Sequence, residues 1–363
     1  MLTEFDELTC HQVVSTFDHP DTSDRAWTEK LWCNIHDTSG ELVLATGLGI
    51  YPNRNVMDGY ACINVGNKEQ TNIRLSRELR PRIAELCVGP LSYRVNQPYR
   101  SILLTLGENI HDISFELEFI GRMQPGEEKP QYGRRNGRLF VNTCRYAQLG
   151  RARGWVKVGD RRFELDEEHF LAQRDHSWGI RMGVGAPEQG VQDQDIATFR
   201  AMMINWLTLQ FSTWGIYCYY IERADGKVVN LAGSVVSTLD DGAPPVLITR
   251  VDHDFEYHPG SARMASGRMV LHLEDDRQLE ISMNELTTMY LRGGNYVGYK
   301  GVTHGTWMGP EWADGERWDV AHPKVANEVH GLDDTVVQAR CGDEVGHGII
   351  ENMILPPYPR YGF

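Results

Sequence analysis

The residues best suited to chemistry lie together near the middle of the chain. Eight consecutive residues there combine two guanidiniums, a carboxylate, an imidazole and an indole, in the order Arg174-Asp175-His176-Ser177-Trp178-Gly179-Ile180-Arg181. Side chains two apart on a strand share a face, so a strand here would place Arg174, His176 and Trp178 on one wall. An imidazole beside an indole suits a pocket in which a proton moves while the aromatic face stabilises developing positive charge.

We therefore predict that His176 and Trp178 are catalytic, because ligand clefts tend to lie at domain junctions and this string precedes a linker-like stretch. The charged neighbours Arg174, Asp175 and Arg181 fit a structural role better, since arginine–carboxylate pairs commonly lock such junctions. Arg174 nevertheless shares the face of His176, and is also a candidate for binding substrate.

Glu351 is the candidate proton donor. It lies in a strand-like segment near the C-terminus, where glycines at 346 and 348 allow close approach. A carboxyl group in an apolar pocket has its pKa raised, and can then protonate an alkene or an alcohol near neutral pH. An alternative of equal weight is that Glu351 pairs with an arginine, such as Arg174 or Arg181, across the domain junction.

Three further residues are candidate substrate contacts. His304 and Trp307 form a second His/Trp cluster, in a loop that contains a glycine, and Tyr60 lies in a strand-like run. The alternative for all three is a structural role without ligand contact, because histidines in loops and aromatic residues in strands more often only pack against their neighbours. The polar run 252–258 does not converge three ligands on one strand face, so we predict no metal site.

The segments that position these residues have the periodicity of strands. Alternating or apolar runs, bounded by Gly, Pro, Asn or Asp, recur through both halves, as at Glu29–Ile35, Val56–Val65 and Gln278–Met283. A Gly-, Pro- and acid-rich stretch from Gly183 to Asp195 divides the two series, and a short helix at Asp195–Met203 would lead into the second. Many strands with short turns predict an all-β protein of two successive antiparallel units.

The composition is that of a globular protein with an acidic balance. Of 363 residues, 36 are Lys or Arg and 50 are Asp or Glu, so the net charge is −14. Nucleic acids and anionic membranes bind clustered Lys and Arg, so neither is an expected partner. No run approaches the roughly 20 apolar residues of a membrane span, and we expect no stable membrane insertion. Seven cysteines without a CxxC pair, and an acidic start unlike a secretory signal, predict a cytoplasmic protein.

The familiar cofactor and nucleophile motifs are absent from the sequence. It has no G-x-x-x-x-G-K-[ST], no H-E-x-x-H, no G-x-S-x-G and no complete dinucleotide fingerprint. We therefore expect no cofactor. A hydride- or metal-dependent oxidoreductase has no motif in its favour and is the weakest alternative.

One string and the end of the chain point to a known family. The string is His-Ser-Trp-Gly at 176–179, and the end reads Gly346-His347-Gly348-Ile349-Ile350-Glu351-Asn352-Met353, followed by Pro359-Arg360-Tyr361-Gly362. With two β units of similar size, these features resemble the carotenoid 1,2-hydratase (hydroxyneurosporene synthase) and AttH-like superfamily. The resemblance implies two consecutive antiparallel lipocalin- or calycin-like β-barrels packed together. With the boundary placed at the Gly-, Pro- and acid-rich stretch, they would lie at 1–185 and 204–363, with a linker and short helix at 186–203.

The same resemblance bears on chemistry. The wider group includes tocopherol cyclases and fungal Diels–Alderases, which act on hydrophobic, often isoprenoid substrates without a metal or redox cofactor. In carotenoid hydratases an H-x-W pair acts with a downstream Tyr-x-Asp pair that protonates the alkene. The resemblance places the first pair at His176 and Trp178. The second has no clear counterpart, because the tyrosine-rich run 217–220 is followed by Glu222.

We predict a cofactor-independent lyase or isomerase: a hydratase, dehydratase, isomerase or cyclase. It would act by acid/base chemistry on a C=C bond or alcohol of a hydrophobic small molecule (isoprenoid, polycyclic or aromatic) bound between the two barrels. Trp178 would stabilise the cation, and His176 would position or deprotonate water. The alternative is a non-catalytic, lipocalin-like carrier of an apolar ligand, which the missing Tyr-x-Asp pair favours. The sequence leaves open whether the chain forms a homo-oligomer.

Overall fold

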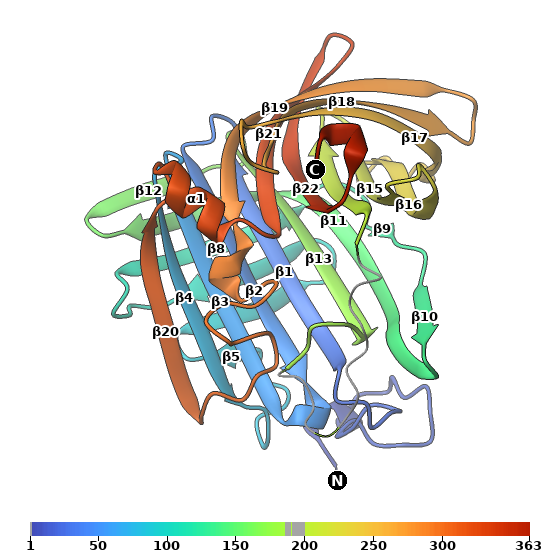
Figure 1. The fold of residues 1–363 in the computed structure, drawn as a ribbon. Helices are drawn as coiled ribbons and strands as arrows, with labels where there is room; N and C mark the ends of the chain where they lie inside the picture. The colour runs from blue at the N-terminus through green and yellow to red at the C-terminus, as the bar shows by residue number, and fades with distance from the viewer. Residues whose placement is uncertain (1, 186–189, 191–199) are drawn as a thin grey trace.

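In the computed structural model, which describes residues 2–185, 190 and 200–363, the chain is an antiparallel β protein (Figure 1). Its strands form one large curled sheet and one closed barrel. The described residues also form a few short helices: the α-helix α1 (Pro323–Val329) and the 3-10 helices η1 (Glu4–Glu7), η2 (Pro52–Arg54), η4 (Leu291–Gly294) and η5 (Pro359–Tyr361). The prediction of an all-β protein of two units is confirmed.

The large sheet takes nearly all of its strands from the N-terminal half of the chain. In spatial order they are β20 (Glu311–Asp319), β4 (Glu69–Glu78), β3 (Val56–Val65), β2 (Leu42–Tyr51), β1 (Trp27–Asp37), β13 (Phe170–Ile180), β11 (Arg138–Val158), β8 (Ile113–Gly121), β7 (Ser101–Leu106), β6 (Leu91–Gln97) and β5 (Cys87–Val88). Three short strands pair with β11: β9 (Gly126–Glu127), β10 (Gln131–Arg135) and β12 (Arg161–Leu165). Short hairpin turns join most neighbours. At one of them, Asn136 and Gly137 both have positive φ, as a two-residue hairpin turn requires.

The second unit is a closed barrel of eight strands. They are β14 (Met202–Gln210), β15 (Trp214–Arg223), β16 (Val228–Ser237), β17 (Val246–Tyr257), β18 (Met264–Leu273), β19 (Gln278–Tyr290), β21 (Asp333–Cys341) and β22 (Glu344–Leu355). Inward-facing residues such as Phe255, Met269, Leu271 and Ile350 are buried together. A barrel of this size is just wide enough for side chains to fill.

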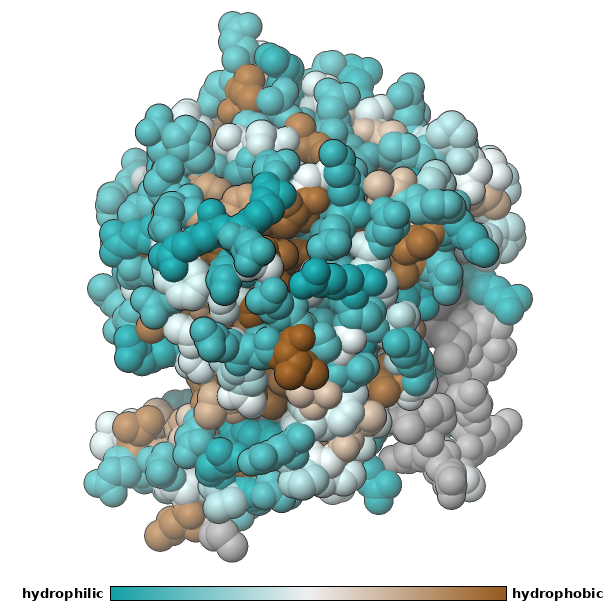
Figure 2. All heavy atoms as spheres, turned by 90° about the vertical axis from the view of Figure 1, so that its left-hand side faces the viewer, coloured by the Kyte–Doolittle hydropathy of each residue, from teal (hydrophilic) through white to brown (hydrophobic). Residues whose placement is uncertain are grey.

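One strand crosses between the halves of the chain. β20 comes from the C-terminal half, within the range 204–363 expected to form the second barrel, yet it pairs along its whole length with β4 of the first sheet. Buried Arg74 on β4 binds Asp314 and Glu316 on β20, each at 2.8 Å. β20 covers the edge of β4 that would otherwise expose unpaired backbone groups. The face of the molecule that carries β20 is mainly hydrophilic (Figure 2).

The region between the two units is only partly described. Of the linker and helix expected at 186–203, residues 186–189 and 191–199 lie outside the described residues. Met202 and Met203 do not belong to a helix, because they begin β14 and pair with β15 and β22. None of the helices formed by the described residues has the length and apolar character needed to cross a bilayer.

The barrel packs against the outer face of the large sheet. At this junction Trp32 of β1 meets Trp206 of β14 edge-on, with ring centroids 5.4 Å apart, inside a cluster of buried apolar side chains from both units. Asn34, two residues along β1, donates a hydrogen bond of 2.8 Å to Asp334 of β21. Alternation along β1 therefore sends Trp32 and Asn34 towards the barrel, and sends Leu31 and Cys33 into the interior of the curled sheet.

Candidate functional site

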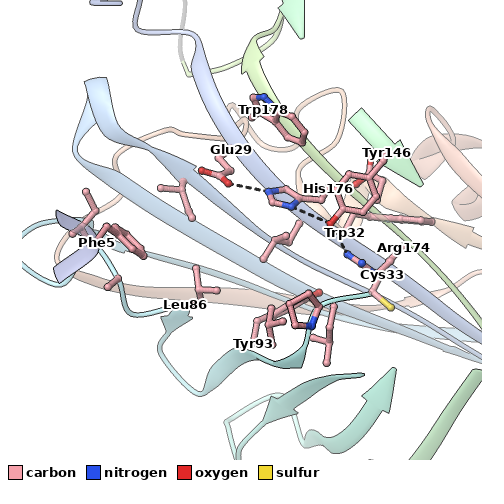
Figure 3. A pocket seen from close by; sticks show the side chains of 18 of the residues that line it. Phe5, Glu29, Trp32, Cys33, Leu86, Tyr93, Tyr146, Arg174, His176 and Trp178 are labelled. Carbon is pink, nitrogen blue, oxygen red and sulfur yellow. Dashed lines mark hydrogen bonds and ion pairs between the residues drawn. The ribbon is translucent and has the colours of Figure 1, made fainter. Parts of the chain in front are cut away.

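A cavity of about 770 Å³ lies inside the curled sheet, and it has the size of a typical small-molecule pocket. Its lining is mostly apolar and includes Phe5, Leu31, Ile50, Leu86, Tyr93, Leu104 and Phe119. Figure 3 shows side chains from both sides of the curled sheet pointing into this space, with Phe5 of the N-terminal segment at one end. The cavity was expected between the two barrels. It lies within the first unit instead, and the junction, where Trp32 and Trp206 pack together, leaves only a smaller cavity.

His176 stands on the wall of this pocket, held from two sides. It lies on β13, opposite Leu31 of β1 and Tyr146 of β11. Its Nε2 is 2.9 Å from Oε1 of Glu29, and its Nδ1 is 3.4 Å from the hydroxyl of Tyr146. With the proton on Nε2, Glu29 accepts a hydrogen bond from the imidazole, and Nδ1 accepts one from Tyr146. Figure 3 shows this chain of contacts from one strand to the next.

Arg174 holds Tyr146 in place at the other end of this series of hydrogen bonds. Its Nη1 donates to the Tyr146 oxygen at 3.2 Å, and its Nε and Nη2 donate to Oε1 of Gln148 at 3.1 and 2.8 Å. The side chain is only 5 % exposed, and the guanidinium carbon lies 5.2 Å from the Tyr146 ring centroid. A buried cation thus contacts the one atom of Tyr146 that gains negative charge when its proton leaves.

Trp178 shares the face of His176 and Arg174, as strand alternation predicts. Its ring centroid is 5.4 Å from that of His176 and 6.5 Å from that of Tyr146. It is 40 % exposed while still lining the pocket. An indole in this position can contact both a bound molecule and solvent.

Glu351 lies elsewhere. It belongs to β22 at the junction, on the opposite side of β1 and β13 from His176, and lines a smaller cavity of about 90 Å³. Burial raises the pKa of Glu351 to about 7, and the pKa of its neighbour Asp334 lies well above the ordinary value. The structure therefore gives Glu351 the raised pKa that was expected, but in a cavity lined by charged side chains rather than an apolar one, and it does not bring Glu351 together with His176.

Tyr60 and His304 also lie at the junction rather than in the large pocket. The hydroxyl of Tyr60 is 3.4 Å from that of Tyr296, and Nε2 of His304 is 3.0 Å from Nζ of Lys30. Burial, with Lys30 close by, holds the pKa of His304 well below its usual range. Trp307 contacts neither cavity and is 51 % exposed in its loop.

The structure adds Glu29 and Tyr146 to the candidate site. Both lie far from His176 in the sequence, and only the register of β1 and β11 against β13 brings them beside it. Glu29 begins a strand-like run that the sequence does show, and it is the first polar residue on its inward face. Among the described residues, no three His, Cys, Asp or Glu side chains gather where they could hold a metal ion.

Comparisons with known proteins place the fold. A model described as "Family of unknown function (DUF8625)" matches residues 2–363, and no curated protein matches the chain. The chain is similar to the crystal structure of an AttH-type protein from Nitrosomonas europaea, with 10 % identity and a TM-score of 0.55, covering 91 % of this chain and 93 % of that one. It is similar to CghA, solved alone and with Sch210972, with 8 % identity and a TM-score of 0.51, covering 91 % and 89 %.

Kievitone hydratase from Nectria haematococca also matches, with 10 % identity and a TM-score of 0.48, covering 94 % of this chain and 93 % of that one. At these identities the first two likenesses show the fold. They confirm the expected double-barrel fold.

Proposed function

Since the chain belongs to the family of unknown function DUF8625, we propose its activity from its own pocket: acid/base chemistry on a bulky apolar small molecule held inside the first sheet. One observation carries the proposal. In a mostly apolar pocket, His176 is hydrogen-bonded to both Glu29 and Tyr146, and Arg174 contacts the tyrosine oxygen. Such an arrangement can move a proton where water is largely displaced by the ligand.

The contacts suggest a closed route for the proton. Tyr146 gives its proton to the substrate, and the guanidinium of Arg174 stabilises the phenolate oxygen that remains. His176 then takes a proton at Nδ1, from the attacking water in a hydration or from substrate carbon in an isomerisation. Glu29 stabilises the imidazolium. The imidazolium returns its proton to Tyr146, whose oxygen is 3.4 Å from Nδ1, and both groups are restored.

The class of reaction is inferred from the aromatic side chain that lines the pocket beside His176. Trp178 presents an aromatic face beside His176, and such a face stabilises a carbocation. We therefore propose hydration, dehydration, isomerisation or cyclisation at a C=C bond or alcohol of an isoprenoid, polycyclic or aromatic molecule. The structure of CghA with Sch210972, which shares this fold, supports the presence of a small organic ligand.

A non-catalytic carrier is the second candidate. It is favoured by the position of Glu351, since the carboxyl whose pKa is raised to about 7 lies at the junction and not in the large pocket. The pocket would then only enclose an apolar ligand, as lipocalin-type barrels do.

The experiment is incubation of the full chain with apolar alkenes and with tertiary and allylic alcohols in ¹⁸O-labelled water, followed by mass spectrometry. Label incorporated into product, and lost in His176→Ala, supports a hydratase. Unlabelled isomers of the substrate support an isomerase or cyclase. His169→Ala is the matched control, because that histidine is exposed on the surface beside Asp166. Retention of turnover in His176→Ala would remove the proposed mechanism, and ligand bound without any turnover would leave the carrier.

A further inference from the structure

The smaller cavity at the junction has properties unlike those of the pocket. Its volume is about 90 Å³, several times the 10–15 Å³ that one water needs on this measure. It lies between β1, β13 and the barrel, and charged side chains from both units line it together with Trp206 and Leu332. A molecule of a few heavy atoms would fit.

Two cations in this cavity have hydrogen-bond donors to spare. Within the described part of the chain, the Arg181 guanidinium makes one hydrogen bond, of 3.4 Å, to Oγ of Ser177. Nζ of Lys30 contacts His304 at 3.0 Å and lies 3.8 Å above the centre of the Tyr296 ring, which leaves part of its three-donor capacity unused. Both cations line the same cavity.

Two neutral or anionic groups are also unpaired there. Trp32 is 4 % exposed, and its Nε1 has no acceptor among the described residues. Asp175 uses Oδ2 to pair with Nε of Arg145 at 3.2 Å, whereas its buried Oδ1 has no hydrogen-bond donor from the described residues. A buried donor or acceptor left unsatisfied destabilises the folded state, so these atoms point to a partner bound in the cavity.

We propose that this cavity binds a small 2-hydroxy acid. The carboxylate accepts hydrogen bonds from Arg181, Lys30 and the Trp32 indole, and the hydroxyl donates to Oδ1 of Asp175. A methyl group or a similarly short chain then packs against Trp206 and Leu332.

The lining carries three cations, Lys30, Arg145 and Arg181, against two carboxyl groups, Asp175 and Glu351. Burial raises the pKa of Glu351 to about 7, so an added carboxylate meets an excess of positive charge. Burial and the nearby Arg181 lower the pKa of Lys30 to about 7. An anion beside the amine favours its charged form. Arg145 is less available, because Glu128 and Asp175 already neutralise it at 3.1 and 3.2 Å. Arg181 and Lys30 are therefore the two cations that bind the carboxylate of the hydroxy acid.

The test is isothermal titration calorimetry on the full chain with lactate, acetate and inorganic phosphate. Lactate should bind with a submillimolar Kd, and acetate at least fivefold more weakly, because acetate leaves Oδ1 of Asp175 unpaired. Arg181→Gln should weaken lactate binding at least tenfold. Arg268→Gln is the matched control, since that arginine is exposed and pairs with Glu280 on the barrel surface. The control should leave the lactate Kd unchanged.

A second variant protects the test against misfolding. Asp175→Asn keeps the shape of the side chain, but with its amide oxygen towards Arg145 it presents an NH₂ group to the hydroxyl in place of a carboxylate oxygen. It should reduce the preference for lactate over acetate while acetate still binds. His176→Ala should not change lactate binding. Failure of the smaller cavity to bind lactate and failure of the proposed catalysis in the large pocket are therefore separate results. The inference is overturned if lactate gives no saturable heat, if Arg181→Gln binds it as tightly as the parent chain, or if phosphate binds as tightly as lactate.

Discussion

Two cavities lie back to back on β1 and β13, and they differ in size, polarity and charge. The larger is mostly apolar, with His176 hydrogen-bonded on its wall, and the smaller is lined by Lys30 and Arg181, while Trp32 and Asp175 line both. Neighbours in sequence face opposite sides, so Asp175 pairs at the junction while His176 enters the pocket. Because alternate side chains of a strand point to opposite faces, the same two strands can line an apolar pocket on one face and a charged cavity on the other. A shift of one residue in either strand would exchange them.

The largest expected effect comes from removing the proposed proton donor of the large pocket and leaving the smaller cavity unchanged. Tyr146→Phe deletes the proposed proton donor while keeping the ring, so turnover of a pocket substrate should fall about 10²- to 10³-fold. Lactate binding at the junction should not change. Steady-state kinetics and calorimetry on the same preparation measure the two sides, and unchanged turnover would exclude Tyr146 as the donor.

A change on the junction side should act on stability and its pH dependence. The pKa of Glu351 is raised to about 7 in the folded protein from an ordinary 4.5, so the folded state holds more protons than the unfolded state between these values. Its contribution to the free energy of unfolding therefore falls as pH rises through this window. Glu351→Gln should be more stable than the parent by about 1–3 kcal/mol at pH 8 and nearly equal at pH 4.5.

Urea unfolding of both proteins at the two pH values measures this difference. Asp58, whose pKa is raised to about 6, titrates in both proteins, so its contribution cancels. Lys30 and Asp334 interact with Glu351, so the difference reports Glu351 together with these two neighbours. Equal gains at the two pH values would contradict the assignment. The pocket variant Tyr146→Phe should show the pH dependence of the parent.

A smaller effect is expected from the residue that holds the imidazole. Glu29→Gln keeps a hydrogen-bond acceptor near Nε2 of His176 but removes the charge that stabilises the imidazolium, so turnover should fall about tenfold. Steady-state kinetics measure the loss, and full turnover in the variant would indicate that Glu29 only packs.

The smallest effect on stability should come from filling the pocket. Leu86 is half-buried and lines the cavity, so Leu86→Trp has empty space to occupy and should change the free energy of unfolding by less than about 1 kcal/mol. Apolar ligands should bind more weakly, whereas lactate should bind as before. A fluorescent apolar probe measures the first effect. Equal affinity for the probe in both proteins would place its binding site elsewhere.

The sequence predicted the local parts of the site better than its assembly. Alternation along one strand correctly placed Arg174, His176 and Trp178 on one wall, because the period of side chains is a property of the strand itself. Glu29 and Tyr146 were not predicted, since they depend on pairings between residues 147 and 30 positions apart. The raised pKa of Glu351 was expected from burial, but not the face on which it lies.

The fold shows the same limit. The two β units were predicted from strand periodicity and from the family resemblance, whereas β20 was not. Its sequence, Glu-Trp-Ala-Asp-Gly-Glu-Arg-Trp-Asp, is mostly polar, because an edge strand has one free side that must resist further pairing. Because so many of its residues are charged, β20 lacks the alternation of apolar and polar residues by which strands are predicted. The same charges discourage other chains from pairing with this edge of the sheet.

The attachment of β20 to β4 has a consequence for how the protein is made. During synthesis the last residue of β4, Glu78, emerges 241 residues before Asp319 completes β20. At 5–20 residues per second, the ribosome needs roughly 10–50 s to cover that distance. For this interval the nascent N-terminal sheet has no β20 beside β4, so the backbone groups along that edge are unpaired and open to contact with other chains. Only when the second unit is almost finished does the first receive its outermost strand.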